Sequence, residues 1–96
     1  MEKRLGRPRR NRKIGFKHKA NFFKPQGRPL SDLKLIEITK EELEALRLKD
    51  LVGLDQRKCA EKMDISPSTF QRLVSTARKK VSQALIEGQA ILIKEI

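Results

Sequence analysis

The clearest periodic pattern of apolar residues lies in the second half of the chain, between residues 67 and 87. Seven apolar positions recur there at helical spacing and form one stripe of a helix: Phe70, Leu73, Val74, Ala77, Val81, Ala84 and Leu85. A roughly opposite stripe holds short polar and basic side chains: Ser68, Gln71, Arg72, Ser75 and Lys79. Because Ser66 is a good N-cap, Pro67 suits the first helical position and Gly88 can end a helix, the pattern predicts a helix at about 67–87. One face of this helix should lie in a core and the other in solvent.

An earlier helix is predicted from a capping box in the segment Thr39-Lys40-Glu41-Glu42. The threonine hydroxyl can accept a hydrogen bond from the amide of the third helical residue, while the Glu42 side chain reaches back. We expect this helix to run from about residue 40 to 52 and to end at Gly53, a natural C-terminal cap residue.

A short helix is expected at about 56–63, after Asp55, with one apolar face made by Cys59, Ala60 and Met63. Three residues then join it to the long helix. A short helix, a three-residue turn and a longer helix form a helix-turn-helix, in which the second helix enters the major groove of DNA. Asp64 stands where glycine usually occupies the left-handed turn position, a conformation that Asp tolerates better than most residues. A plain helical hairpin in a three-helix bundle is the alternative.

Two short apolar segments flank these helices, Leu35-Ile36-Glu37-Ile38 and Ala90-Ile91-Leu92-Ile93. Each can form a short strand, and the two strands could pair within one chain or between two chains. The predicted fold class is nevertheless all-α. We expect a small helical bundle that contains the helix-turn-helix in residues 29–96, preceded by a basic, largely extended arm in residues 1–28.

Charge is distributed unevenly between these two parts. The 96 residues contain 23 Lys and Arg against 12 Asp and Glu, which gives a net charge of +11. Residues 1–28, the basic arm, hold 11 of the basic residues and one acid, whereas residues 29–96 hold 12 basic and 11 acidic residues. Lysine and arginine that neutralise nucleic-acid phosphates release condensed counterions, so the arm is predicted to bind phosphates. A tail that only increases solubility is the alternative.

The basic arm contains the tripeptide Gly-Arg-Pro twice, at residues 6–8 and 27–29. An extended segment of this kind can lie in a narrow minor groove, as an AT-hook does. Leu5 stands where an AT-hook prefers arginine, so general contact with the DNA backbone is the preferred interpretation. The residues expected on phosphates or in the minor groove are Arg7, Arg9 and Arg10.

Three phenylalanines, Phe16, Phe22 and Phe23, stand among the lysines of the arm. Such side chains stack on bases in proteins that bind single strands. More often they tie an arm to a core, and we favour this second interpretation.

The composition of the chain excludes several classes of protein. A single cysteine, Cys59, and a single histidine, His18, exclude intrachain disulfides, Cys/His zinc sites and most histidine-based catalysis. The longest apolar run has four residues, so we expect no membrane span and no secretory signal, and a cytoplasmic protein. Helix-start electrostatics explain the acids Glu41, Glu42 and Glu44. We therefore expect that the protein is not an enzyme and that it binds no metal ion and no cofactor.

Several motifs occur in an order that is typical of one family: Phe23-Lys24-Pro25-x-Gly27, Glu42-Leu43-Glu44-Ala45-Leu46-Arg47-Leu48, Cys59-Ala60-x-x-Met63, Ser66-x-x-Thr69-Phe70, Ala77-Arg78-x-Lys80-Val81 and Ala84-Leu85-x-x-Gly88. Over about residues 10–93 the chain resembles a family of short, largely uncharacterised prokaryotic proteins, classed as a domain of unknown function. The resemblance implies a basic N-terminus, a helix-turn-helix similar to region four of sigma factors, DNA binding and a role in transcription regulation.

The exposed stripe of the long helix supplies the candidate DNA contacts. The side chains expected on base edges are Ser68, Gln71, Arg72 and Ser75. Arginine can pair with guanine and glutamine with adenine through two hydrogen bonds each. The residues expected on phosphates are Thr69, Arg78, Lys79 and Lys80. For Arg78 and Lys80, ordinary solvated charge is the alternative.

The sequence therefore predicts a sequence-specific protein that binds double-stranded DNA and regulates transcription. RNA or ribosome binding is the first alternative, because a basic arm with scattered phenylalanines also suits RNA. A docking module of the transcription machinery that contacts RNA polymerase is the second, with Leu43, Leu48 and Val52 as its candidate surface. A homodimer is a further hypothesis, since a helix-turn-helix of this size usually needs two half-sites.

Overall fold

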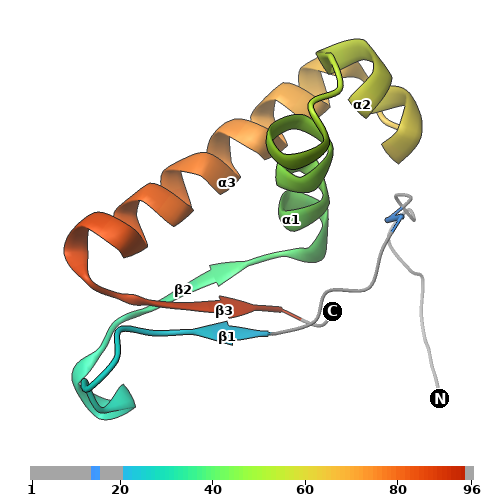
Figure 1. Cartoon of the computed structure of the whole chain (residues 1–96). Helices are drawn as coiled ribbons and strands as arrows, with labels where there is room; N and C mark the ends of the chain where they lie inside the picture. Colours follow the sequence, from blue (N-terminus) through green and yellow to red (C-terminus); the bar gives the residue numbers. More distant parts are fainter. Residues whose placement is uncertain (1–13, 16–20, 95–96) are drawn as a thin grey trace, which may run out of the picture.

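The computed structural model describes residues 14–15 and 21–94, and in this part of the chain three helices lie on one side of a small sheet (Figure 1). The strands are β1 (Phe22–Phe23), β2 (Leu35–Ile38) and β3 (Ala90–Ile93). The α-helices are α1 (Lys40–Leu46), α2 (Gln56–Met63) and α3 (Pro67–Glu87). A 3-10 turn, η1 (Leu30–Asp32), precedes β2, and a π-helical turn, η2 (Arg47–Val52), continues α1.

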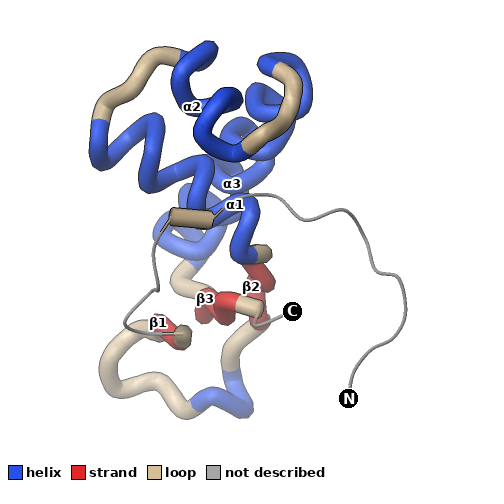
Figure 2. The backbone as a smooth tube through the Cα atoms, turned by 90° about the vertical axis from the view of Figure 1, so that its right-hand side faces the viewer, coloured by secondary structure: helices blue, strands red, loops and turns tan. Residues whose placement is uncertain are grey.

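The three strands form one mixed sheet, so the expectation of an all-α fold is wrong. β3 lies in the centre, antiparallel to β1 and parallel to β2, and Figure 2 shows the three strands grouped together beneath the helices. Of the two alternatives for segments 35–38 and 90–93, the structure has pairing within one chain. The local pattern of apolar residues could not show that β2 and β3 pair with each other, because all three helices separate the two strands in the sequence.

The end of the basic arm forms part of this sheet. Phe22 pairs with Leu92 and Phe23 with Ile91, and the Ile93 amide donates a 2.9 Å hydrogen bond to the Asn21 carbonyl. These phenylalanines therefore tie the arm to the body, which was the favoured interpretation. Phe16 and residues 1–13 lie outside the described residues, so the extended conformation expected for most of the arm stays a prediction.

The main core lies where the helices meet. Seven buried side chains compose it: Ala45, Leu48, Cys59, Ala60, Met63, Phe70 and Val74. Phe70 has no exposed surface and is the largest of them. The Cys59 thiol donates a 3.6 Å hydrogen bond to the Leu54 carbonyl, and burial raises the pKa of this thiol. Cys59 thus serves the packing of the core.

Side-chain caps define where the helices begin. Thr39 and Glu42 form the capping box, in which the Glu42 amide donates to Thr39 Oγ1 over 3.1 Å and the Thr39 amide donates to Glu42 Oε1 over 3.0 Å. Asp55 accepts from the Lys58 amide and Ser66 from the Thr69 amide. The helical residues lie in the ranges that these caps predict, with one difference: the first helix ends in the wider π-helical turn η2.

The turn between α2 and α3 passes through a left-handed residue, Asp64, with φ of 59° and ψ of 47°. The Asp64 amide donates to the Glu61 carbonyl and the Ile65 amide donates to the Ala60 carbonyl, both over 3.1 Å. The last carbonyls of α2 are satisfied in this way, and the chain reverses into α3 within three residues.

Replacing Asp64 with glycine should raise the free energy of unfolding by about 0.5 kcal/mol, because glycine adopts the left-handed conformation without the steric cost of a Cβ atom. Urea unfolding followed by circular dichroism measures the change. Asp64→Ala is the matched control and should lower stability. A glycine variant less stable than the wild type would show that the Asp64 carboxylate contributes more to this turn than the backbone strain costs.

Candidate nucleic-acid interface

The exposed face of α3 lies opposite its buried stripe. The four residues expected on base edges, Ser68, Gln71, Arg72 and Ser75, are all exposed. The Gln71 side-chain amide donates a 2.9 Å hydrogen bond to Ser75 Oγ. Arg72 forms no hydrogen bond or ion pair with the described residues, so its guanidinium keeps its donors available to a ligand. The structure thus brings these four side chains together on one solvent-facing surface.

The turn and α2 hold the first turn of α3 in place. The Gln56 side chain donates a 3.1 Å hydrogen bond to the Pro67 carbonyl, and Ser66 Oγ donates to Thr69 Oγ1 over 2.9 Å. Ala60 is buried between the two helices, where a small side chain permits a close crossing. Thr69, expected on a phosphate, is half-buried, and its hydroxyl already accepts this bond from Ser66.

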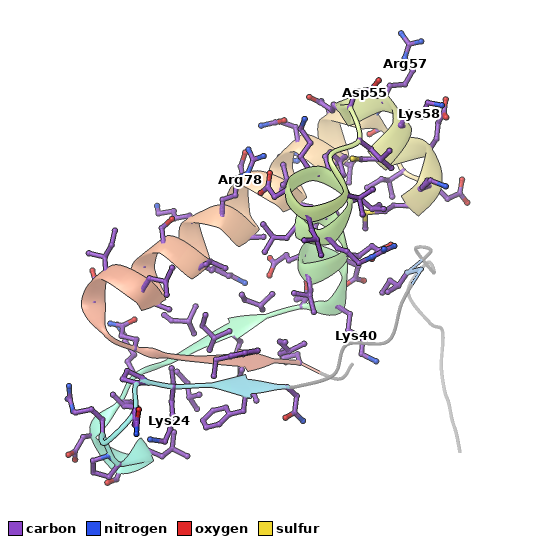
Figure 3. The ribbon with its side chains drawn as sticks, in the orientation of Figure 1. Lys24, Lys40, Asp55, Arg57, Lys58 and Arg78 are labelled. Carbon is purple, nitrogen blue, oxygen red and sulfur yellow. The ribbon has the colours of Figure 1, made fainter. Side chains whose placement is uncertain are left out.

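Arg78 forms an ion pair inside the protein. Its Nε and Nη2 atoms donate to the two carboxylate oxygens of Asp50, in η2, over 3.0 and 2.7 Å. The hydrogen bond from Arg78 lowers the pKa of the Asp50 carboxyl, so both groups are charged at neutral pH. Figure 3 places Arg78 midway along α3. The pair joins η2 to α3 and neutralises a charge that the sequence assigned to a phosphate.

Lys80 is also paired within the protein. Its Nζ donates a 2.8 Å hydrogen bond to Glu42 Oε1, and Glu42 is only 7% exposed. The bond joins α3 to the start of α1 and adds a second role to the capping residue. Of the four α3 residues expected on phosphates, Lys79 alone is exposed and has no partner among the described residues.

Two exposed cations at the start of α2 were not singled out from the sequence. Arg57 and Lys58 lie in the first turn of α2 and project at the outer end of this helix, near Asp55 (Figure 3). They lie at the same end of the molecule as the start of α3. Their position in the first helix of a helix-turn-helix was the available signal, because that helix crosses the DNA backbone in such complexes.

A buried carboxylate fastens the basic arm to α1. The Gly15 amide donates a 2.9 Å hydrogen bond to Glu44 Oε2, and Arg47 donates to both Glu44 oxygens over 2.8 and 3.1 Å. Glu44 is 2% exposed, and its hydrogen bond raises the pKa of Arg47. Helix-start electrostatics therefore does not fully explain Glu44. Arg7, Arg9 and Arg10 lie outside the described residues.

The described part of the chain contains neither a cluster of metal ligands nor a helix that could span a membrane. Within residues 14–15 and 21–94, no group of three or more His, Cys, Asp and Glu side chains is placed to hold a metal ion. No helix in these ranges is long and apolar enough to cross a membrane.

These features define a small mixed α/β protein in which a short helix, a three-residue turn and a long helix present a polar and basic face to solvent. A family described as "Protein of unknown function DUF134" matches residues 1–95, and the chain belongs to this family. This confirms the resemblance to an uncharacterised prokaryotic family. Similarity to region four of sigma factors stays a prediction.

Similar proteins include UPF0251 proteins of three organisms. The chain is 50% identical over 90 residues to one from Desulforudis audaxviator, 46% over 87 residues to one from Halothermothrix orenii, and 48% over 89 residues to one from Clostridium botulinum. The matches cover 94, 91 and 93% of this chain but 59, 64 and 57% of the relatives. The chain thus spans about six-tenths of the length of these relatives. No solved structure matches it.

Replacing Asp50 with asparagine should release Arg78 and increase the affinity for duplex DNA, if Arg78 lies near the DNA backbone. One additional neutralised phosphate steepens the slope of log K against log salt by about 0.9. Fluorescence anisotropy at several salt concentrations measures both quantities. The control, Asp32→Asn, removes an exposed acid of η1, away from α3, and should leave the slope unchanged. Equal slopes for the wild type and both variants would exclude Arg78 as a phosphate contact.

Proposed function

We propose that this protein binds double-stranded DNA in a sequence-specific manner through α3 and regulates transcription. The proposal depends on one observation, the exposed face of α3 that carries Ser68, Gln71, Arg72 and Ser75. α2 and the turn at Asp64 support α3 from its buried side, as the recognition helix of a helix-turn-helix requires. This is a binding function without a catalytic step, carried out in the cytoplasm.

Arg72 and Gln71 are the side chains proposed to read base edges. Arg72 has no partner among the described residues and can donate two hydrogen bonds to guanine O6 and N7. The Gln71 amide has two N–H donors, of which one is used by Ser75, so its carbonyl and its second N–H remain available for adenine.

The basic arm is proposed to supply affinity that carries little sequence information. It holds 11 basic residues and a single acid, and its phosphate contacts would depend strongly on salt. The bond between Gly15 and Glu44 attaches it to α1. Thirteen residues precede Ile14, and an extended segment of that length spans at most about 45 Å. We propose that this segment follows the DNA backbone beside α3.

Docking to RNA polymerase is a second candidate function, favoured by the surface of η2. Leu51 and Val52 are 81% and 52% exposed, and adjacent exposed apolar side chains of this kind form the core of many protein-protein contacts. Leu48, which the sequence assigned to this surface, is buried in the core, and Leu43 is half-buried. A docking surface would therefore centre on Leu51 and Val52.

Replacing Arg72 with alanine should reduce the preference for a selected DNA site over a scrambled one by about 5- to 150-fold, because a guanine contact through two hydrogen bonds contributes about 1–3 kcal/mol of discrimination. The site is selected from a random duplex pool, and both affinities are then titrated. Lys79→Ala is the control and should weaken both duplexes equally. Equal binding of the two duplexes by the wild type would remove the basis of the proposal.

Replacing Arg7, Arg9 and Arg10 together with alanine should lower the affinity for every duplex and reduce the salt slope by up to about 2.7, at about 0.9 for each phosphate lost. The ratio between specific and scrambled sites should remain that of the wild type. The same titrations, with a structured RNA hairpin as a third ligand, provide the measurement. A triple variant that loses the ratio as well would assign sequence readout to the arm, and tighter binding of the hairpin than of duplex DNA would favour the RNA alternative.

A further inference from the structure

An apolar groove lies between the carboxyl-terminal half of α3 and strands β1 and β3. It consists of two adjoining hollows of about 220 and 350 Å³ that share Phe23 and Ile91 as lining residues. Only apolar residues line the smaller hollow, among them Leu43 of α1 and Val81 of α3. None of the described residues fills this groove.

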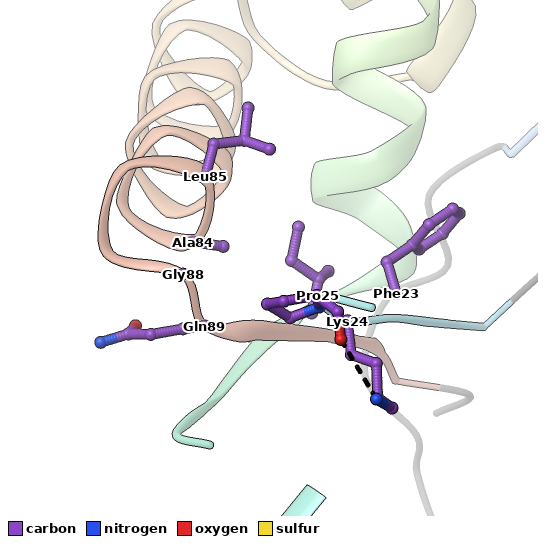
Figure 4. A pocket seen from close by; sticks show the side chains of 8 residues that line it. Phe23, Lys24, Pro25, Ala84, Leu85, Gly88 and Gln89 are labelled. Carbon is purple, nitrogen blue, oxygen red and sulfur yellow. Dashed lines mark hydrogen bonds between the residues drawn. The ribbon is translucent and has the colours of Figure 1, made fainter. Parts of the chain in front are cut away.

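Large apolar side chains project beside the same groove. Leu85, on the α3 wall, is 75% exposed. Phe23, on the β1 wall, is 54% exposed. Figure 4 shows Leu85 and Phe23 on opposite walls of the larger hollow, with Pro25 between them. The same surface thus carries an apolar hollow and, beside it, projecting apolar side chains.

We propose that this groove binds a second copy of the chain, and that each copy inserts its Leu85 into the groove of the other. In a two-fold symmetric dimer both copies use the same surface, so that surface must be complementary to itself. The groove and Leu85 meet this requirement. Segment 35–38 of one copy does not pair with segment 90–93 of another in this structure, because β2 and β3 already pair within one chain.

The charge around the groove favours a second copy over a charged partner. Lys24 is the one charged residue among the described residues that line the two hollows. Its Nζ donates to the carbonyls of Pro25 and Arg28, at 3.1 and 2.5 Å. A nucleic acid or an acidic peptide would therefore find little ionic attraction there. An apolar partner surface, such as that of a second copy, is therefore the better match to this lining.

The size of the surface indicates how tightly two copies would associate. The largest apolar patch of a typical monomeric protein covers roughly 300–600 Å², whereas a stable interface buries about 800 Å² on each partner. A contact made by one such patch on each copy therefore lies at the low end of specific interfaces, and we expect a weak dimer. The proposal does not depend on DNA binding, although two docked copies would present two exposed faces of α3.

Sedimentation equilibrium of the full chain, without DNA, tests the proposal. Between about 1 and 500 μM the wild type should change from the 11.1 kDa monomer to twice that mass. Leu85→Glu places a charge in the partner's groove and should raise the dimer dissociation constant at least tenfold. Leu85→Ala, which introduces no charge, should raise it by a smaller factor.

Thr76→Glu is the matched control, because it adds the same charge at an exposed position on another face of α3 and should leave dimerisation unchanged. Thermal unfolding by circular dichroism checks that each variant folds. A wild type that remains monomeric over the whole range would overturn the proposal. So would folded Leu85 variants that dimerise as tightly as the wild type, because the interface would then lie elsewhere.

Discussion

The burial of one stripe of α3 is the interaction on which the rest of this structure depends. Phe70 and Val74 pack against α1, η2 and α2, and Ala84, further along the helix, is buried as well. Because this stripe faces the core, Arg72 and its neighbours on the opposite stripe must face solvent. The same helix thus holds the fold together, presents the proposed DNA-reading face and forms one wall of the apolar groove.

Ion pairs then divide the basic residues of α3 into two groups. Arg78 pairs with Asp50 and Lys80 with Glu42, and both pairs join α3 to the preceding helical segments. Arg72 and Lys79 have no such partner among the described residues. Since all four lie on one helix and look alike in sequence, only the positions of the acids on other elements distinguish a structural cation from one available to a ligand.

The sheet determines where the basic arm leaves the body. β3 continues the chain beyond α3 and pairs with β1, which lies in the last part of the arm, and with β2, which leads into α1. Glu44 then receives the Gly15 amide, so the arm is attached at a second point on α1. These contacts anchor a strongly charged segment to the elements that support α3. The arm proposed to contact phosphates and the helix proposed to contact bases are therefore attached to the same set of packed elements.

The sequence by itself determined the local features: the caps at Thr39, Asp55 and Ser66, the three-residue turn and the two stripes of α3. These depend on residues within one or two helical turns of each other, so composition and spacing suffice. One position of the apolar stripe was wrong, because Leu85, expected in the core, is 75% exposed near the end of the helix, where the body no longer covers it. Only the tertiary structure decided that the fold is mixed α/β, that Leu48 is buried and that Glu44 binds the arm. Strand pairing and ion pairs between distant elements join residues 28 to 70 positions apart, such as Arg78 with Asp50 or Phe22 with Leu92, and no local sequence pattern indicates which of these residues meet.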